Sequence, residues 1–170
     1  MKLGGVKIVL AVDLRYGRTV HSLSHALTRF GCQLIFASPK LLKMPTEIVS
    51  DLRESGANVV ETEDLLGSIN DADVVYMTRI QKERFVDEDE YARCAGAYKL
   101  HADNLADVKS EMIIMHPLPR VDEIHASVDS TRHACYFNQA FNGVVARMAL
   151  ICYLLGVTVT VDVESEGGAL

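Results

Sequence analysis

The chain has 170 residues, of which 49% are hydrophobic and 24% charged, a composition typical of one soluble globular domain and not of a disordered or fibrous protein. Its formal net charge of −6 argues against a nucleic-acid partner, because phosphate binding needs a clustered excess of Lys and Arg. The longest apolar stretch, residues 148–159, is shorter than the roughly 20 residues that span a bilayer, and the N-terminus has no signal-peptide pattern, so we expect a cytoplasmic protein without a membrane segment.

The first half of the chain alternates between strand and helix patterns. Residues 6–12 form a continuous apolar, β-branched run, as expected for a parallel strand buried on both faces. Apolar residues then recur at helical spacing over residues 20–30, and Gly31 follows as a C-terminal cap. The same unit repeats as a strand at 33–37, a helix at 46–54 and a strand at 58–61.

The second half continues this alternation in shorter segments. A short helix is predicted at residues 64–69, a strand at 73–77 and an acidic helix at 87–94. A brief strand near 97–100 and a helix near 104–109 follow. The pattern predicts a doubly wound α/β fold, with a mostly parallel sheet flanked by helices.

The chain closes with a strand at residues 112–115 and a long helix at 134–155 that carries a broad apolar stripe. We expect one domain over residues 1–159 and a disordered tail over 160–170. The four cysteines lie far apart in the sequence, without a C-x-x-C pair, so we predict reduced, mostly buried thiols and neither a metal nor a cofactor. The absence of G-x-G-x-x-G also argues against a dinucleotide site.

Ligands of open parallel sheets gather beyond the carboxyl ends of the strands, so the loops at residues 13–19, 78–85 and 116–124 are the candidate site. The first loop places Arg18 in the first turn of the following helix, where the helix dipole disfavours a cation. An anion held between the guanidinium and the free N–H groups would explain this position. A structural ion pair with Asp13 is the alternative.

The second loop, residues 78–85, is dense in long polar side chains. If residues 78–84 form a helical turn, Arg79 and Glu83 stand at positions i and i+4, so that Glu83 can hold the guanidinium while its other edge faces a ligand. Gln81 would add a neutral amide contact. An ordinary solvated charged surface is the alternative interpretation of this cluster.

The third loop reads H-P-L-P-R-V-D-E-I, and its two prolines bracket Leu118. Such a rigid loop can aim backbone carbonyls at a substrate amine, although an ordinary proline-stabilised turn would read the same way. His116 is either a general base or, as we favour, a hydrogen-bonding support. Two arginines, an amide and a rigid turn suit a small dicarboxylate with an amine, and no nucleophile with a neighbouring base is evident.

Three segments carry a family resemblance: D-L-R-Y-G-R-T-V-H-S-L, Y-M-T-R-I-Q-K-E-R and H-P-L-P-R-V-D-E-I. Over residues 3–159 the chain resembles the second domain of aspartate carbamoyltransferases, whereas ornithine carbamoyltransferases typically have H-C-L-P in the third segment. The resemblance implies that Arg18 and Arg79 bind the aspartate carboxylates and that Gln81 assists. It also implies that the backbone of Leu118 and Pro119 contacts carbamoyl phosphate.

The remaining positions of these motifs are expected to support the site or its closure. They are Arg15, Tyr16, Glu83, His116, Pro117 and Arg120, and residues 84–91 resemble a mobile segment that shuts over the site. One position departs from the family pattern, since Val12 stands where the family usually has Gly. A β-branched residue does not adopt positive φ cheaply, so we expect either a turn that does without positive φ or a shifted loop.

The implied reaction is attack of the L-aspartate amine on the carbamoyl carbon of carbamoyl phosphate, which gives N-carbamoyl-L-aspartate and phosphate in pyrimidine synthesis. The family's first domain, which holds carbamoyl phosphate and its catalytic residues, has no counterpart in the sequence. We therefore expect no catalytic residue on this chain, and inactivity until that domain is supplied. The last helix should then be partly uncovered, and a homo-oligomer, a trimer in the family, is expected.

Two other functions remain open at this point. One is a non-catalytic binding or assembly module derived from this domain. The other is a carbamoyltransferase for a different amino acid, which the second and third segments do not suggest.

Overall fold

The structure is a computed structural model that describes residues 3–96 and 98–158. Its centre is a five-stranded sheet in the order β3-β2-β1-β4-β5, and every neighbouring pair is parallel. The strands are β1 (Lys7–Ala11), β2 (Gln33–Ala37), β3 (Val59–Thr62), β4 (Val74–Met77) and β5 (Ile113–Met115). The predicted parallel α/β sheet is confirmed.

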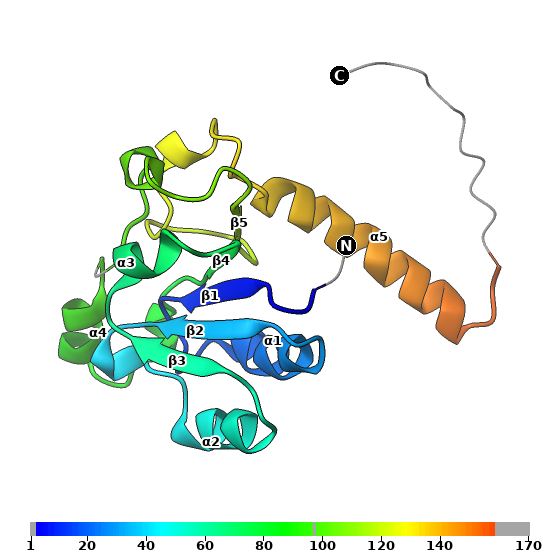
Figure 1. Ribbon diagram of the computed structural model, residues 1–170, viewed down its shortest axis with the longest axis horizontal. Helices are drawn as coiled ribbons and strands as arrows, with labels where there is room; N and C mark the ends of the chain where they lie inside the picture. The colour runs from blue at the N-terminus through cyan, green and yellow to red at the C-terminus, as the bar shows by residue number, and fades with distance from the viewer. Residues whose placement is uncertain (1–2, 97, 159–170) are drawn as a thin grey trace.

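Helices cover both faces of this sheet (Figure 1). The α-helices are α1 (Arg18–Arg29), α2 (Thr46–Glu54), α3 (Leu65–Ile69), α4 (Glu88–Cys94) and α5 (Tyr136–Leu154). Four short 3₁₀ turns join them: η1 (Lys40–Leu42), η2 (Lys82–Arg84), η3 (Ala102–Leu105) and η4 (Ala126–Val128).

The continuous apolar run of β1 is explained by burial on both faces. Ile8 and Leu10 pack into the cluster that includes residues of α1 and α2, whereas Val9 and Ala11 pack into the cluster that includes residues of α3. Successive side chains of a strand point to opposite faces, so a central strand covered on both sides needs an apolar residue at every position.

Two predicted elements are wrong. Residues 98–100 form no strand, because Leu100 makes only an isolated bridge, its N–H donating to Glu123 O and its carbonyl accepting from His125 N–H; residue 97 lies outside the described residues. The helix predicted at 104–109 is reduced to the turn η3. Its start is fixed by the Asn104 side chain, which accepts the His101 N–H at 2.8 Å, and a segment this short cannot repay helix nucleation.

Val12 does adopt positive φ, at 85°. It is fully buried, and its N–H donates to Ala37 O at 3.0 Å. Such a conformation costs about 1–3 kcal/mol for a residue with a side chain and persists only where its surroundings fix it. The loop therefore keeps the positive-φ turn despite the β-branched residue, and Arg18 stays at the first position of α1.

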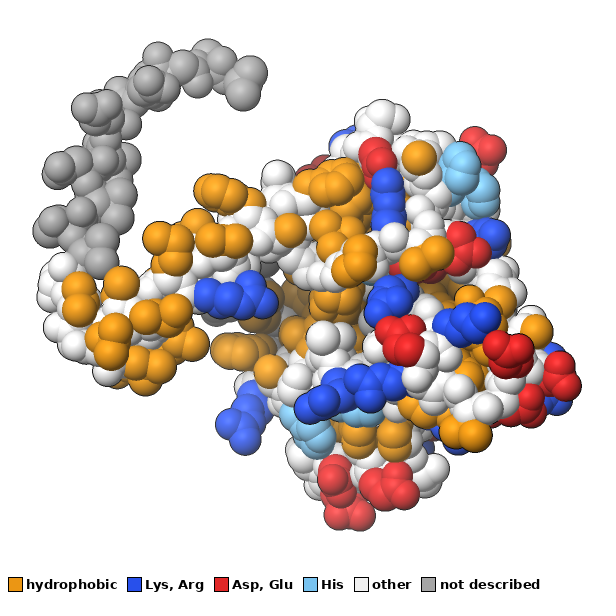
Figure 2. Space-filling model, turned by 180° about the vertical axis from the view of Figure 1, so that it is seen from behind, with side chains coloured by type: hydrophobic (Ala, Val, Ile, Leu, Met, Phe, Trp, Pro, Cys, Tyr) orange, Lys and Arg blue, Asp and Glu red, His pale blue; other side chains and the backbone are white. Residues whose placement is uncertain are grey.

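α5 leaves the body of the domain and extends away from it (Figure 1). Its apolar side chains are largely exposed: Phe137, Phe141, Val144, Val145, Met148, Leu150, Ile151, Tyr153 and Leu154. Figure 2 shows hydrophobic side chains gathered on this protruding segment. A contiguous apolar surface of this kind marks an interaction site, which agrees with the predicted uncovered stripe.

The remaining sequence predictions concern the thiols, the membrane and the tail. All four cysteines are free; Cys32 and Cys94 are buried, but Cys135 and Cys152 are only partly so. Within residues 3–96 and 98–158, no helix has the length and apolar character to cross a membrane. The tail predicted at 160–170 lies outside the described residues.

Candidate functional site

A pocket of about 250 Å³ opens where the loops after β1, β4 and β5 meet. These strands are neighbours, and β1 and β4 flank the point where the strand order reverses, which is where open α/β sheets bind ligands. The lining residues are Tyr16, Gly17, Arg18, Thr19, Thr78, Arg79, Gln81, Arg84, His116, Pro117, Leu118 and Pro119. The three loops singled out in the sequence are thus brought together.

The first loop places Arg18 at the start of α1. Gly17 precedes it, and a Cβ there would lie 2.3 Å from Asp13 O, so no side chain fits at this turn. Gly17 offers no side-chain cap to the helix. Backbone carbonyls instead accept two of the first N–H groups of α1, that of Arg18 by Tyr16 O at 2.9 Å and that of Val20 by Gly17 O at 3.0 Å.

Asp13 is not the partner of Arg18. It is fully buried, and its Oδ1 accepts the Tyr16 N–H at 2.8 Å. Among the described residues, Asp13 Oδ2 is buried without a hydrogen-bond partner. Burial raises the pKa of the Asp13 carboxyl above its ordinary value, and the Tyr16 N–H opposes that rise only in part.

Thr78 joins the first loop to the second. Its hydroxyl accepts the Asp13 N–H at 2.9 Å, and it lies 2.9 Å from Ala11 O, to which it can donate. The residue is buried, so these bonds fix the relative position of the two loops. The sequence places Thr78 in the second loop but gives no sign of this role.

The second loop holds Arg79 in the pocket. Arg79 Nη2 donates to Glu83 Oε1 at 2.6 Å, as predicted. Only Lys82–Arg84 of this loop form a 3₁₀ turn, and the extended Gln81 precedes it. The Glu83 backbone N–H and the Arg79 guanidinium lower the pKa of Glu83.

A third arginine, Arg84, also lines the pocket. Arg84 was grouped with the closing segment, but it lines the pocket, and its Nε lies 3.5 Å from Gln81 Oε1. Three arginines, Arg18, Arg79 and Arg84, thus line one small pocket.

The third loop is held by His116, whose side chain is buried. The Leu118 N–H donates to His116 Nδ1 at 2.8 Å, and His116 Nε2 lies 2.7 Å from Glu123 Oε1. Both ring nitrogens are therefore engaged, which argues against a general base and supports the expected supporting role.

Two arginines that were expected near the site lie outside the pocket. Arg15 Nη1 donates to Glu90 Oε1 at 3.0 Å and to Leu41 O at 3.3 Å. Its neighbour Tyr16 lines the pocket and packs edge-on against Phe85, with ring centroids 5.3 Å apart. These contacts connect the first loop to residues 84–91.

Arg120 takes part in a hydrogen-bond network with Asp129 and Tyr136, outside the pocket lining. Its guanidinium donates to both carboxylate oxygens of Asp129, and the Tyr136 hydroxyl also donates to Asp129. The Arg120 hydrogen bonds lower the pKa of Asp129 to about 2. Burial, followed by the Asp129 carboxylate, raises the pKa of Tyr136 to about 12. Arg120 thus anchors the loop to the start of α5.

Replacing Asp129 by asparagine should lower the free energy of unfolding by about 1–2 kcal/mol at pH 7, after allowance for partial solvent exposure. The folded pKa lies below the ordinary value of 3.8, so this stabilisation is full above about pH 4 and is lost as the pH falls toward 2. Urea denaturation at pH 7 and pH 3 measures it. Asp51→Asn, at an exposed position on α2, is the control; equal effects of the two changes would contradict the prediction.

The chemistry of the pocket follows from its charge. Three arginines line the pocket, and the Glu83 carboxylate is paired with one of them, Arg79. Such a pocket attracts a small dianion, and the exposed backbone of a proline-rich loop adds carbonyl acceptors for a donor group. Within the described residues, no cluster of three or more His, Cys, Asp or Glu could hold a metal ion.

Comparison with known proteins gives one consistent family. Residues 4–154 match the model described as "Aspartate/ornithine carbamoyltransferase, Asp/Orn binding domain". The aspartate carbamoyltransferase catalytic subunit of Thermococcus kodakarensis is 53% identical over 92% of this chain and 50% of its own length. That of Methanothermobacter thermautotrophicus is 51% identical over 91% of this chain and 49% of its own length.

Solved structures agree with these relatives. The catalytic subunit of M. jannaschii aspartate transcarbamoylase superposes with a TM-score of 0.82 at 46% identity, over 91% of this chain and 51% of that one. The Trypanosoma cruzi enzyme in complex with carbamoyl phosphate and aspartate superposes with a TM-score of 0.80 at 35% identity, over 88% and 50%. The chain thus spans about half the length of the relatives it matches.

Proposed function

The chain belongs to the aspartate/ornithine carbamoyltransferase family, in which it matches the Asp/Orn-binding domain, and we propose that it is the aspartate-binding half of an aspartate carbamoyltransferase. It would hold L-aspartate while the amine attacks the carbamoyl carbon of carbamoyl phosphate. The products would be N-carbamoyl-L-aspartate and phosphate.

The observation that carries this proposal is the convergence of Arg18, Arg79 and Arg84 on one pocket. Two carboxylates of L-aspartate would be matched by Arg18 and Arg79, each as a fork of N–H donors, with Gln81 assisting. The cationic side chain of ornithine would instead face three guanidinium groups at short range. Within this family the electrostatics of the pocket therefore favour aspartate.

The third loop is proposed to contact the second substrate. The backbone of Leu118 and Pro119, at the rim of the pocket, would bind carbamoyl phosphate between the two halves of the enzyme. Because the described residues that line the pocket include no nucleophile paired with a free base, we assign this chain positioning and electrostatic complementarity rather than proton transfer. Carbamoyl phosphate and aspartate are bound together in the T. cruzi relative.

We further propose that a carbamoyl-phosphate domain covers α5. An exposed helix with Phe137, Phe141 and Met148 on one face is unfavourable in water, and the relatives are about twice as long as this chain.

The contacts of Arg15 and Tyr16 with residues 84–91 support a joint role in closing the site over its substrates. A homo-oligomer, with the trimer of the family as the expected form, completes the proposal.

Titration of the isotopically labelled chain with L-aspartate, followed by NMR, tests the ligand class. We expect saturable shifts confined to the residues around the pocket, with L-ornithine at equal concentration producing none there. Matching shifts with ornithine, or aspartate shifts spread over the surface, would count against the proposed pocket.

A further inference from the structure

Glu123 is a buried carboxylate outside the lining of the pocket, with 3% of its surface exposed. Its oxygens collect donors from two directions. The His116 ring lies on one side, with Nε2 2.7 Å from Oε1. The backbone N–H groups of Val121 and Asp122 lie on the other, 3.1–3.3 Å from the carboxylate oxygens.

These contacts fix the tautomer of His116. The Leu118 N–H can donate only to an unprotonated Nδ1, so the ring proton lies on Nε2 and points to the Glu123 carboxylate. A single imidazole thereby links Glu123 to the backbone of Leu118. The His116 N–H, in turn, donates to Gln139 Oε1 on α5 at 2.9 Å.

Leu118 needs such support, because its φ is 49°, in the left-handed region. A leucine held there is strained, because its Cβ lies too close to the following carbonyl oxygen. The hydrogen bond from the Leu118 N–H to His116 Nδ1 holds the backbone of Leu118 in this conformation. Since Leu118 and Pro119 line the pocket, the direction of their backbone groups depends on how firmly the ring is held.

We propose that Glu123 is a positioning residue for the proposed reaction, which orients the His116 ring and through it sets the backbone of Leu118 and Pro119 against the substrates. This rests on the proposed function of the pocket. Glu123 contacts no substrate itself and acts only through the ring and the loop.

The donors around Glu123 require a carboxylate and not an amide at this position. A buried carboxylate is costly unless several donors satisfy it, and here the His116 ring and the backbone N–H groups of Val121 and Asp122 donate to it. Burial alone would raise the pKa of Glu123, but the His116 ring and the backbone N–H groups outweigh it and lower that pKa. A glutamine would turn an NH₂ group toward one of these donors, so it cannot replace the carboxylate.

The test compares Glu123→Gln, His116→Ala and the double variant, each as the full chain combined with a carbamoyl-phosphate domain. We expect kcat/KM to fall roughly 10- to 100-fold in each single variant, as for other groups that orient a ligand-contacting residue. If Glu123 acts through His116, kcat/KM of the double variant falls no further than kcat/KM of the more impaired single variant. Glu61→Gln, at a glutamate on β3 paired with Arg53 of α2, should leave kcat/KM unchanged.

An NMR measurement on the wild-type chain alone completes the test and does not depend on activity or on the folding of the variants. We expect ring nitrogen shifts that show His116 with its proton on Nε2, and slow hydrogen exchange of the Leu118 amide. Additive losses in the double variant, wild-type kinetics for Glu123→Gln, or a proton on Nδ1 would each overturn the role of Glu123. An inactive wild-type mixture with the expected NMR result would instead contradict the proposed function.

Discussion

Replacing Arg79 by alanine should weaken the binding of L-aspartate by roughly 30- to 150-fold, or about 2–3 kcal/mol, the range expected for loss of charged hydrogen bonds to a carboxylate. Arg79 lines the pocket and is oriented by Glu83 at 2.6 Å. The variant also leaves Glu83 without its cation, which adds repulsion toward the substrate carboxylates. Calorimetric titration of L-aspartate into the chain combined with a carbamoyl-phosphate domain measures the change.

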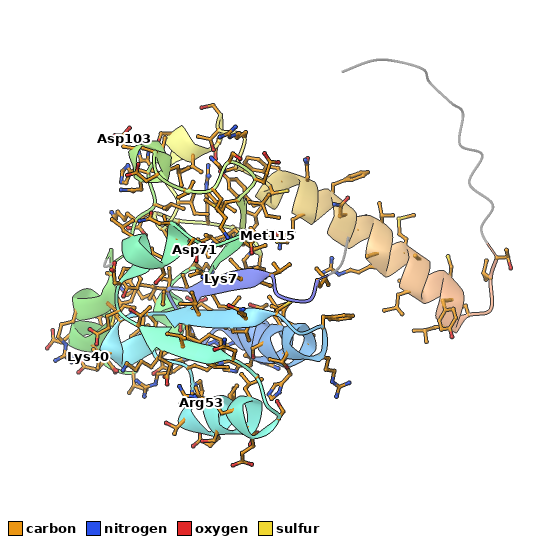
Figure 3. The ribbon with its side chains drawn as sticks, in the orientation of Figure 1. Lys7, Lys40, Arg53, Asp71, Asp103 and Met115 are labelled. Carbon is orange, nitrogen blue, oxygen red and sulfur yellow. The ribbon has the colours of Figure 1, made fainter. Side chains whose placement is uncertain are left out.

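Arg53→Ala is the matched control for this experiment. Arg53 also pairs with a glutamate, Glu61, at 3.1 Å, but it lies on α2, well separated from Met115 at the end of β5 near the pocket loops (Figure 3). We expect its affinity to stay within about twofold of wild type, as for a surface ion pair remote from the ligand. Equal affinities of wild type and Arg79→Ala would remove Arg79 from the aspartate site.

A chain carrying both Phe141→Gln and Met148→Gln should bind the carbamoyl-phosphate domain roughly 100-fold more weakly, or worse. The two residues stand seven positions apart on one face of α5 and are 68% and 62% exposed. Burying each side chain in an interface contributes about 1.5–3 kcal/mol, whereas glutamine keeps the helix propensity. Sedimentation or calorimetry of the two-component mixture measures the loss.

Leu66→Gln provides the control for this pair of changes. It removes an exposed leucine from α3, on the body of the domain, with 46% of its surface accessible. We expect unchanged association for this variant. If the α5 double variant associated as tightly as wild type, the helix would not be the docking surface.

The sheet and the location of the pocket were predictable because their causes are local and repetitive. A strand buried on both faces must be apolar throughout, as β1 is, and parallel strands bring their following loops to one edge. Arg18, Arg79, Gln81 and residues 116–119 could therefore be assigned to one site before their geometry was known. Their proximity in the pocket supports that assignment.

The contacts that could not be predicted are those whose partners lie elsewhere in the chain. Arg120 stands in a motif that suggests the site, yet Asp129 and Tyr136 hold it from 9 and 16 positions away. Arg15 is held by Glu90 at a separation of 75 positions. A long cationic side chain reaches several partners, and sequence spacing does not decide among them.

The sequence contains weaker indications of the residues that support the pocket without binding the substrate. Glu123 was part of the recognised third segment, but only the buried contact with His116 reveals its role. Gly17 could have been found, because a glycine directly before a helical arginine suggests a close backbone approach, here to Asp13 O. The glycine usual in the family at the position of Val12 raised the question of positive φ, but the expectation that a valine would avoid it, or that the loop would shift, is wrong: the φ of Val12 is 85°, and the residue is fully buried.

The most direct test of the proposed function is the formation of N-carbamoyl-L-aspartate from L-aspartate and carbamoyl phosphate. It would be measured with the chain alone, with the carbamoyl-phosphate domain of the M. jannaschii relative alone, and with the two combined. We predict product only in the mixture, and its loss when the chain carries Arg79→Ala. Absence of product from a mixture in which the two components demonstrably associate would contradict the enzyme-half proposal and favour a non-catalytic binding or assembly module.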